Sequence, residues 1–453
     1  MDFRRAKRFQ VLVGAGFLAL VVATSIPVNA APGPSSASDQ NWGSTATASV
    51  IATSAPGLFP SSFGDVRVDN ADDITVYVVG TDPALESWVN GRLSSGVHVT
   101  YLTVKYSLEQ LNALVTQVEH DTSTLKAQGV NMAYLGPDAA TSTVDVILQT
   151  PPTANSTTAG TASATVAPAG YANAAQVALN ALYGNGRLTV SSYTSTPATP
   201  LDGYCPVGCR FDDYSAFYGG DSITTSAGVG CSSGFAVRES NGTPAVLSAG
   251  HCSTGRGTEE FVNCEYGQNN CSVSCPGSYP SYCPVRELGT TGTYQPPSTG
   301  WDFEAIDMPS GLTSTNEVYG GSPTSHDPPI YTVNGQVLEA SGACCLTVDG
   351  ATVGETIHDV VFSDDWSAFY DGYWVNSLGV TYNRADPGDP MCGPGDSGGP
   401  VYEHESNYSD VLANGTLVAN SPGFPIGGGT TVWACLFQEL YESLGGDGLT
   451  LVT

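Results

Sequence analysis

Basic residues are scarce in this chain of 453 residues, where 14 Lys and Arg stand against 43 Asp and Glu, a net charge of −29. The last lysine is Lys126. A surface of this charge repels nucleic acid and anionic membranes, so we expect neither nucleic-acid binding nor stable membrane association. The charge suits an extracellular, acidic environment, although neutral drift of surface residues would give the same composition.

Long apolar runs are missing beyond the first thirty residues, which argues against a later transmembrane helix. Residues 1–30 have the form of a secretory signal peptide, with four basic residues, an apolar stretch at 11–22 and small residues at 28–30. An uncleaved anchor is the alternative, but the apolar stretch is short and no basic cluster follows it. Removing the segment leaves 10 basic and 42 acidic residues, a net charge of −32. We expect a secreted, extracellular protein.

Cysteine is absent from the first two hundred residues, and all 12 cysteines lie between Cys205 and Cys435. An even set in a secreted chain predicts disulfides, up to six of them. Cys271 and Cys275 have the spacing of half a zinc site, but an oxidising compartment favours a disulfide there. The sequence therefore predicts no metal site.

The rest of the chain divides into parts of different patterning. Residues 31–64, rich in Ala, Ser, Pro and Gly, predict a flexible lead-in. Residues 65–200 mix helical and strand periodicities and predict a small α+β domain without a catalytic set of its own. After a change of composition over 201–218, short alternating runs bounded by turn residues continue to residue 431 of the domain 219–453, and only 436–444 has a helical pattern again. The alternating runs predict an all-β domain.

The clearest local signal is a helix in the α+β domain. Ser107 is placed to cap its N-terminus, and Gln110 completes a capping box. Apolar residues then recur at helical spacing until Gly129, which ends the predicted helix. A Gly-Pro-Asp turn at 136–138 is predicted to join two strands.

The sharpest chemical motif is GDSGGP at residues 395–400. Hydrolysis of an amide needs an activated nucleophile and hydrogen-bond donors for the developing oxyanion. Ser397 supplies the nucleophile, and the glycines let the N–H groups of Gly395 and Ser397 point at one spot. An ordinary glycine-rich turn is the alternative, but six specified positions in a row argue against it.

A second motif, LSAGHC, occupies residues 247–252. A lone histidine is most often structural. Here small residues precede His251 and leave room for a neighbour, while Cys252 follows and would clamp the loop to Cys231. We assign His251 as the general base for Ser397.

These motifs resemble the chymotrypsin-like serine peptidases, and within them the bacterial streptogrisin and α-lytic protease group. The resemblance covers residues 217 to about 445 and includes FYGGD at 217–221 and CSSGF at 231–235. It implies a double β-barrel catalytic domain. It also implies that Asp302, in DFEAI at 302–306, orients His251, with Asp307 as the nearest competitor.

The resemblance further implies that residues 65–200 are a pro-region, which assists folding and inhibits the enzyme until it is cut within 201–218. The function expected is a secreted serine endopeptidase, a monomer that acts on protein or peptide substrates and needs no cofactor. No charged residue occurs at 391–394 or 419–431, which predicts an apolar pocket for large hydrophobic side chains.

Two alternatives remain from other classes. One is a catalytically inactive binding protein on the same fold, although all three catalytic positions are filled. The other is an esterase, but in α/β-hydrolases the histidine follows the serine in the chain, and here it precedes it.

Two segments depart from the group's pattern. A cysteine-bearing insertion before Asp302 predicts a disulfide-knit flap near the substrate cleft. The aromatic segment 366–374 predicts either core packing or a binding surface. The cysteines of the insertion are Cys264, Cys271, Cys275 and Cys283.

Overall fold

The structure is a computed structural model that describes residues 42–149, 170–193, 198–200, 216–265, 282–318, 322–323, 332–343, 357–370, 372–382, 392–404, 410–425 and 431–452. All of them belong to one compact unit, Ala37–Thr453. The predicted signal peptide, residues 201–215 of the predicted processing zone, and Cys271 and Cys275 lie outside the described residues. Among the described helices, none combines the length and apolar character needed to cross a membrane.

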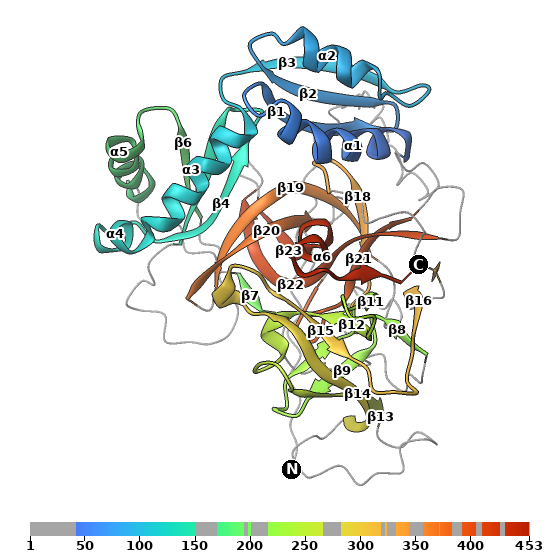
Figure 1. Cartoon of the computed structure of the whole chain (residues 1–453). Helices are drawn as coiled ribbons and strands as arrows, with labels where there is room; N and C mark the ends of the chain where they lie inside the picture. Colours follow the sequence, from blue (N-terminus) through green and yellow to red (C-terminus); the bar gives the residue numbers. More distant parts are fainter. Residues whose placement is uncertain are drawn as a thin grey trace, which may run out of the picture. The chain divides into compact units, whose positions relative to one another are not determined.

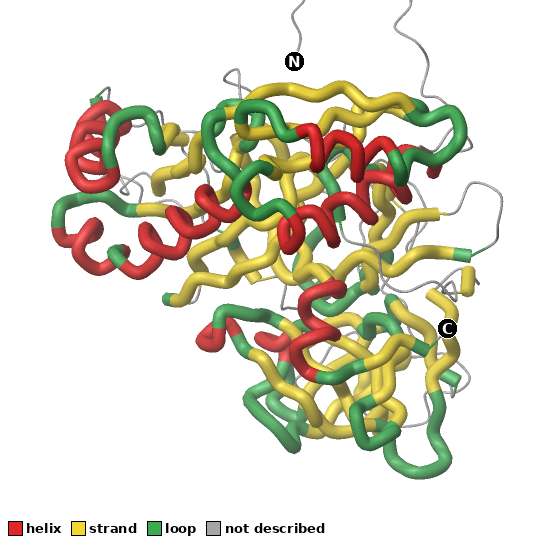
Figure 2. Tube along the Cα trace, turned by 45° about the horizontal axis from the view of Figure 1, so that its top comes forward, coloured by secondary structure: helices red, strands yellow, loops and turns green. Residues whose placement is uncertain are grey.

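Strands make up about half of the described chain, and helices are fewer (Figure 2). In the N-terminal region (42–200) one order of elements occurs twice: a helical segment, an antiparallel hairpin, a helix, and a strand parallel to the second hairpin strand (Figure 1). The first copy is α1 (Trp42–Leu58), β1 (Phe63–Asn70), β2 (Asp73–Val79), α2 (Pro83–Asn90) and β3 (His98–Val104). The second is α3 (Leu108–His120) with α4 (Thr122–Ala127), β4 (Met132–Asp138), β5 (Thr143–Gln149), α5 (Tyr171–Tyr183) and β6 (Leu188–Tyr193).

Helix α3 confirms the capping signal read from the sequence. The Ser107 hydroxyl accepts from the Gln110 backbone N–H, and the Gln110 side chain accepts from the Ser107 N–H. The helix ends at His120, and the predicted remainder forms the separate short helix α4. The predicted turn at 136–138 is wrong: these residues pair in β4, and the turn follows at 139–142.

The flexible lead-in predicted over 31–64 is wrong for residues 42–58, which form α1. Its inner side is built from small residues, and Ala48, Ile51 and Ala55 are fully buried against the core of the first sheet. Small side chains let a helix pack closely on a sheet. They also give a composition that resembles a linker.

The C-terminal region (216–452) is mostly β, as predicted, and ends in α6 (Leu440–Asp447) and β24 (Thr450–Leu451). An eight-stranded sheet has the order β10-β9-β13-β14-β15-β12-β11-β24, and β18-β21-β22-β23-β20-β19 belong to a second sheet. The strands of the eight-stranded sheet before β24 are β9 (Ser222–Thr225), β10 (Gly230–Ser232), β11 (Ala236–Arg238), β12 (Pro244–Ser248), β13 (Glu259–Glu265), β14 (Tyr282–Gln295) and β15 (Phe303–Asp307). Those of the second sheet are β18 (Val337–Ala340), β19 (Ile357–Tyr370), β20 (Tyr373–Tyr382), β21 (Pro400–His404), β22 (Val411–Pro425) and β23 (Thr431–Glu439). A small third sheet joins β8 (Phe217–Gly219), β16 (Ser314–Val318) and β17 (Ser322–Pro323).

The N-terminal region joins the second sheet at two places. Strand β4 pairs antiparallel with β19, placing Leu135 opposite Ser367. Strand β7 (Thr199–Pro200) pairs antiparallel with β22, placing Pro200 opposite Ala419. Tyr134 and Phe424 meet edge to face in the shared core, with ring centroids 5.0 Å apart.

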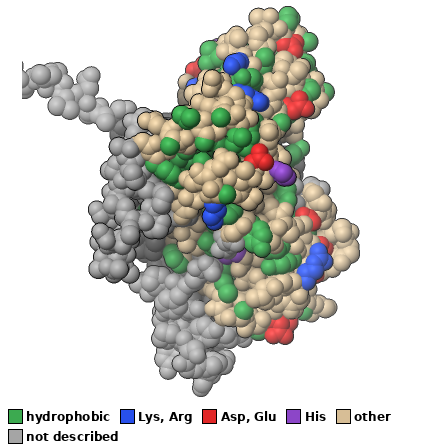
Figure 3. Space-filling model, turned by 90° about the vertical axis from the view of Figure 1, so that its left-hand side faces the viewer, with side chains coloured by type: hydrophobic (Ala, Val, Ile, Leu, Met, Phe, Trp, Pro, Cys, Tyr) green, Lys and Arg blue, Asp and Glu red, His purple; other side chains and the backbone are tan. Residues whose placement is uncertain are grey.

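Charged side chains are sparse on the face drawn in Figure 3, where the Lys and Arg side chains lie apart from one another. That face carries no continuous basic patch within the described part of the chain. This agrees with the low lysine and arginine content of the sequence.

Candidate active site

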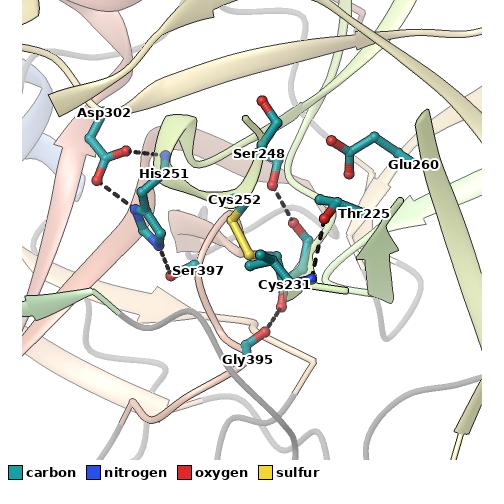
Figure 4. Close-up of a disulfide and its surroundings, with 12 residues drawn as sticks. Thr225, Cys231, Ser248, His251, Cys252, Glu260, Asp302, Gly395 and Ser397 are labelled. Atoms are coloured by element: carbon teal, nitrogen blue, oxygen red, sulfur yellow. Dashed lines mark hydrogen bonds and ion pairs between the residues drawn. A yellow bond between two sulfur atoms is a disulfide. The ribbon is translucent and has the colours of Figure 1, made fainter. Parts of the chain in front are cut away.

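Three side chains that are far apart in the sequence form one chain of hydrogen bonds (Figure 4). His251 Nε2 lies 2.7 Å from Ser397 Oγ, and His251 Nδ1 lies 2.7 Å from Asp302 Oδ2. Ser397 and Asp302 are fully buried, and the His251 side chain is 5% exposed. The structure thus brings together the nucleophile, the base and the orienting carboxylate predicted from the sequence.

His251 lies in a short 3-10 turn, η2 (Gly250–Cys252), at the end of β12. A Cβ built on Gly250 would lie 2.4 Å from the carbonyl oxygen of Gln295, so only glycine lets the turn approach β14 this closely. Cys252 forms a disulfide with Cys231 of β10, which ties the turn to the neighbouring strand. Since the two sulfur atoms are bonded to each other, they offer no thiolate to a metal ion beside His251.

The Asp302 carboxylate accepts three hydrogen bonds. Its Oδ1 accepts from the backbone N–H of His251 at 2.8 Å, and its Oδ2 accepts from the Tyr370 phenol at 2.6 Å in addition to facing Nδ1. The backbone N–H of Asp302 donates to Gln438 Oε1 at 3.0 Å. Asp307, the competitor, lies at the far end of β15, where its carboxyl interacts with Glu239 and Arg256.

Sequence reasoning missed Tyr370. The aromatic segment 366–374 contains it, but nothing in the sequence indicates that β19 reaches Asp302. The segment is mainly core, since Trp366 and Tyr370 are buried, while Tyr373 is 49% exposed.

Ser232 of β10 fixes the loop that carries Ser397. The Ser232 hydroxyl donates to the carbonyl of Gly395 at 2.7 Å and accepts from the N–H of Ala343 at 2.8 Å, and the Ser232 N–H donates to the carbonyl of Ser397 at 2.6 Å. Gly398 adopts φ 93°, and a Cβ there would lie 2.2 Å from the Ser232 carbonyl oxygen. The disulfide Cys392–Cys435 anchors the start of the loop to β23.

Two backbone N–H groups of the turn 395–399 have no acceptor among the described residues: those of Gly395 and Ser397. The neighbouring amides are occupied, since Gly398 donates to the carbonyl of Leu417 at 2.8 Å and Gly399 donates to that of Asp396 at 2.9 Å. Gly395 adopts φ 101°, a conformation that glycine reaches without strain. The unused donors are the pair predicted for an oxyanion hole.

A second pair of carboxyls lies buried beside the triad. Glu304, two residues from Asp302 on β15, and Glu260 on β13 are both fully buried. Burial raises the pKa of Glu260 to about 8. Burial and the neighbouring Glu260 carboxyl raise the pKa of Glu304 well above its ordinary value, and the negative charge of Asp302 acts in the same direction. Sequence reasoning did not identify this pair, because strand alternation alone does not show that both faces of β15 are covered.

The first and last cysteines of the predicted insertion lie in paired strands. Cys264 of β13 is opposite Cys283 of β14 in the strand register. The other two cysteines of the insertion fall outside the described residues. The predicted disulfide-knit flap therefore stays a prediction.

No protein-family description and no curated protein matches the sequence. Among solved structures, the Nocardiopsis protease NAPase is 24% identical, with a TM-score of 0.36, covering 52% of this chain and 99% of that one. Thermobifida fusca protease A is 24% identical, with a TM-score of 0.35, covering 53% and 100%. Cellulomonas bogoriensis chymotrypsin is 22% identical, with a TM-score of 0.34, covering 52% and 98%. The structural neighbours are thus bacterial chymotrypsin-like serine proteases, the group that the motifs at His251 and Ser397 resemble.

Proposed function

We propose that this protein is a serine endopeptidase in which Ser397, His251 and Asp302 form the catalytic triad. The observation that carries the proposal is the continuous hydrogen-bond chain from Asp302 through His251 to Ser397, beside two unused amides. The roles fit these contacts. His251 is placed to act as the base on Ser397, and Asp302 is placed to orient His251. The two amides are placed to donate to the oxyanion that develops from the attacked carbonyl.

In this mechanism Ser397 Oγ attacks the peptide carbonyl while His251 Nε2 takes the hydroxyl proton. Asp302 keeps the Nδ1–H tautomer and stabilises the imidazolium that forms. The amides of Gly395 and Ser397 hold the oxyanion of the tetrahedral intermediate. His251 then gives its proton to the leaving amine, and a water molecule, activated in the same way, hydrolyses the acyl-enzyme. The reaction needs no cofactor.

We further propose that the N-terminal region is an inhibitory pro-region and that the chain is secreted after loss of residues 1–30. The two strand pairings support this, since β7 lies along β22 at Ala419 and Asn420. In the same strand, Leu417 hydrogen-bonds Gly398 and Gly399 next to the nucleophile. A segment in that place would obstruct an extended substrate beside Ser397 until cleavage within 201–218 releases it. The mature enzyme would then be a monomeric double β-barrel domain.

The substrate side chain next to the cut bond is proposed to be large and apolar. Strand β22 contacts the loop of Ser397 through Leu417 and pairs with β7 at Ala419 and Asn420. It contains no charged residue. Val418, Ala419 and Phe424 of this strand are buried. No carboxylate on β22 is therefore available to pair with a Lys or Arg substrate.

The test is cleavage of casein by the secreted protein beside its Ser397→Ala and His251→Ala variants. We expect cleavage by the wild type and its loss in both variants, at unchanged yield of folded protein. A folded and processed wild type that cleaves neither casein nor peptides would overturn the proposal and favour a binding protein on this fold.

A further inference from the structure

Tyr370 lies at the end of β19 with its side chain 3% exposed, and its phenol donates to Asp302 Oδ2 at 2.6 Å. We propose that Tyr370 is a positioning residue. Its hydrogen bond keeps the Asp302 carboxylate oriented towards His251 Nδ1. This inference rests on the proposed function and adds a fourth residue to its triad.

An ionised carboxylate buried away from water requires hydrogen-bond donors, since burial of an unpaired charge is costly. Two of the three donors to Asp302 belong to His251, the residue that Asp302 must orient. Among the described residues, Tyr370 is the one donor to this carboxylate from another part of the chain. It therefore fixes Asp302 independently of the imidazole.

The β19–β20 hairpin holds Asp302 in a second way. The Asp302 backbone N–H donates to Gln438 Oε1, and Gln438 Nε2 donates to the carbonyls of Asn376 and Ser377 on β20, each at 3.0 Å. Tyr370 thus acts on the side chain of Asp302, while β20 acts on its backbone through Gln438. Both strands belong to one hairpin, in which Tyr370 pairs with Tyr373.

The remaining titratable groups around Asp302 are Glu304 on β15, the strand that begins directly after Asp302, and Tyr294 on β14. Neither hydrogen-bonds the Asp302 carboxylate. The phenol of Tyr370 shares Oδ2 with the His251 Nδ1–H, so it draws negative charge away from that hydrogen bond. Its removal should strengthen the attraction of Asp302 for imidazolium and loosen the orientation of the carboxylate.

The test expresses the full-length wild type, the Tyr370→Phe variant and a matched control, Tyr373→Phe, and compares the secreted, processed enzymes. Tyr373 is the half-exposed partner of Tyr370 across the hairpin. Active sites are counted with a fluorophosphonate, and kcat, KM and the pH profile are measured per site with a chromogenic peptide. We expect Tyr370→Phe to lower kcat about 10-fold with KM little changed, as for loss of a hydrogen bond to a charged group. The acid limb of kcat/KM should move to higher pH, and the control should match the wild type.

A purely structural role would reduce the number of active sites but leave kcat per site and the pH profile unchanged, and that result would overturn the inference. Should Tyr370→Phe fail to fold, 3-fluorotyrosine placed at position 370 keeps the shape and donates a stronger hydrogen bond. The acid limb should then move to lower pH, and no movement would count against Tyr370. Wild type that neither labels nor cleaves would overturn the proposed function, and this inference with it. An active wild type with an unaltered variant would overturn the inference alone.

Discussion

Gly136 of β4 faces the indole of Trp366 of β19 so closely that a Cβ built on Gly136 would lie 2.3 Å from Trp366 Cε2. The contact lies beside the pairing of β4 with β19, where the N-terminal region meets the sheet of the C-terminal region. Only glycine fits at this place without moving the ring. Residue 136 therefore offers a way to disturb the junction without altering the proposed mature enzyme.

We predict that Gly136→Ala lowers the yield of active, processed enzyme several-fold while kcat per active site stays at the wild-type value. The added methyl group would displace Trp366 and weaken docking of β4, but the residue would be absent after maturation. Fluorophosphonate titration of culture supernatants measures the yield. Gly57→Ala is the matched control, because a Cβ there meets nothing within 4 Å. Equal yields from both variants would contradict a role of this junction in maturation.

Asp302→Asn should lower kcat by roughly 10³–10⁴-fold. An amide at this position cannot stabilise imidazolium, and it favours the wrong tautomer of His251. Asp307→Asn, at the far end of β15, should leave kcat within about twofold, since Asp307 lies away from the triad. Peptide hydrolysis by the two purified variants distinguishes them. If Asp307→Asn were the more damaging change, the assignment of the orienting carboxylate would be wrong.

The buried pair Glu260 and Glu304 should make the fold less stable as pH rises. The folded pKa of Glu260, about 8, lies above its ordinary value of 4.5. The stabilisation is therefore complete below about pH 4.5 and is lost as pH rises through about 8. In a Ser397→Ala background, which prevents self-digestion, the melting temperature should fall between pH 5 and pH 8. Because about 1 kcal/mol moves the melting temperature of a domain this size by roughly 2–4 °C, a fall of several degrees is expected.

Glu260→Gln should reduce this pH dependence, because an amide keeps the shape of the protonated acid and cannot ionise, while Glu304 remains. Glu287→Gln, an exposed site on β14, serves as the control and should melt like its parent at both pH values. An unchanged fall in Glu260→Gln would show that other groups cause the pH dependence.

A panel of chromogenic peptides should show preference for Phe, Tyr or Leu over Arg and Glu before the cut bond by at least 10-fold in kcat/KM. The physical reason is the uncharged strand β22, which leaves a charged substrate side chain without a partner. Strict cleavage after Arg would contradict the apolar pocket and point to a carboxylate elsewhere.

Short contiguous motifs were enough to predict that His251 and Ser397 act together, and the structure places their side chains 2.7 Å apart. Their catalytic roles stay a proposal. Asp302 followed from resemblance alone, and the structure places it on His251 Nδ1. The helix at Ser107 was predictable for a similar reason, since a capping box is a local signal.

The features that the sequence did not predict depend on contacts between distant segments. Tyr370 reaches Asp302 only because the fold brings together the end of β19 and the residue before β15, two residues that are 68 positions apart in the chain. In the sequence, Glu304 looks like an ordinary strand residue. Its full burial next to Glu260 of β13 depends on the folded chain. Helix α1 was missed because its packing uses small side chains, which a composition argument assigns to linkers.

The proposed mechanism depends on Ser397 being a nucleophile that His251 activates. The most direct test is the intact mass of the secreted wild type after reaction with a fluorophosphonate, followed by peptide mapping of the modified residue. We expect one adduct per chain, located on Ser397 and absent from His251→Ala. An adduct on another residue, or none on a folded and processed wild type, would contradict it.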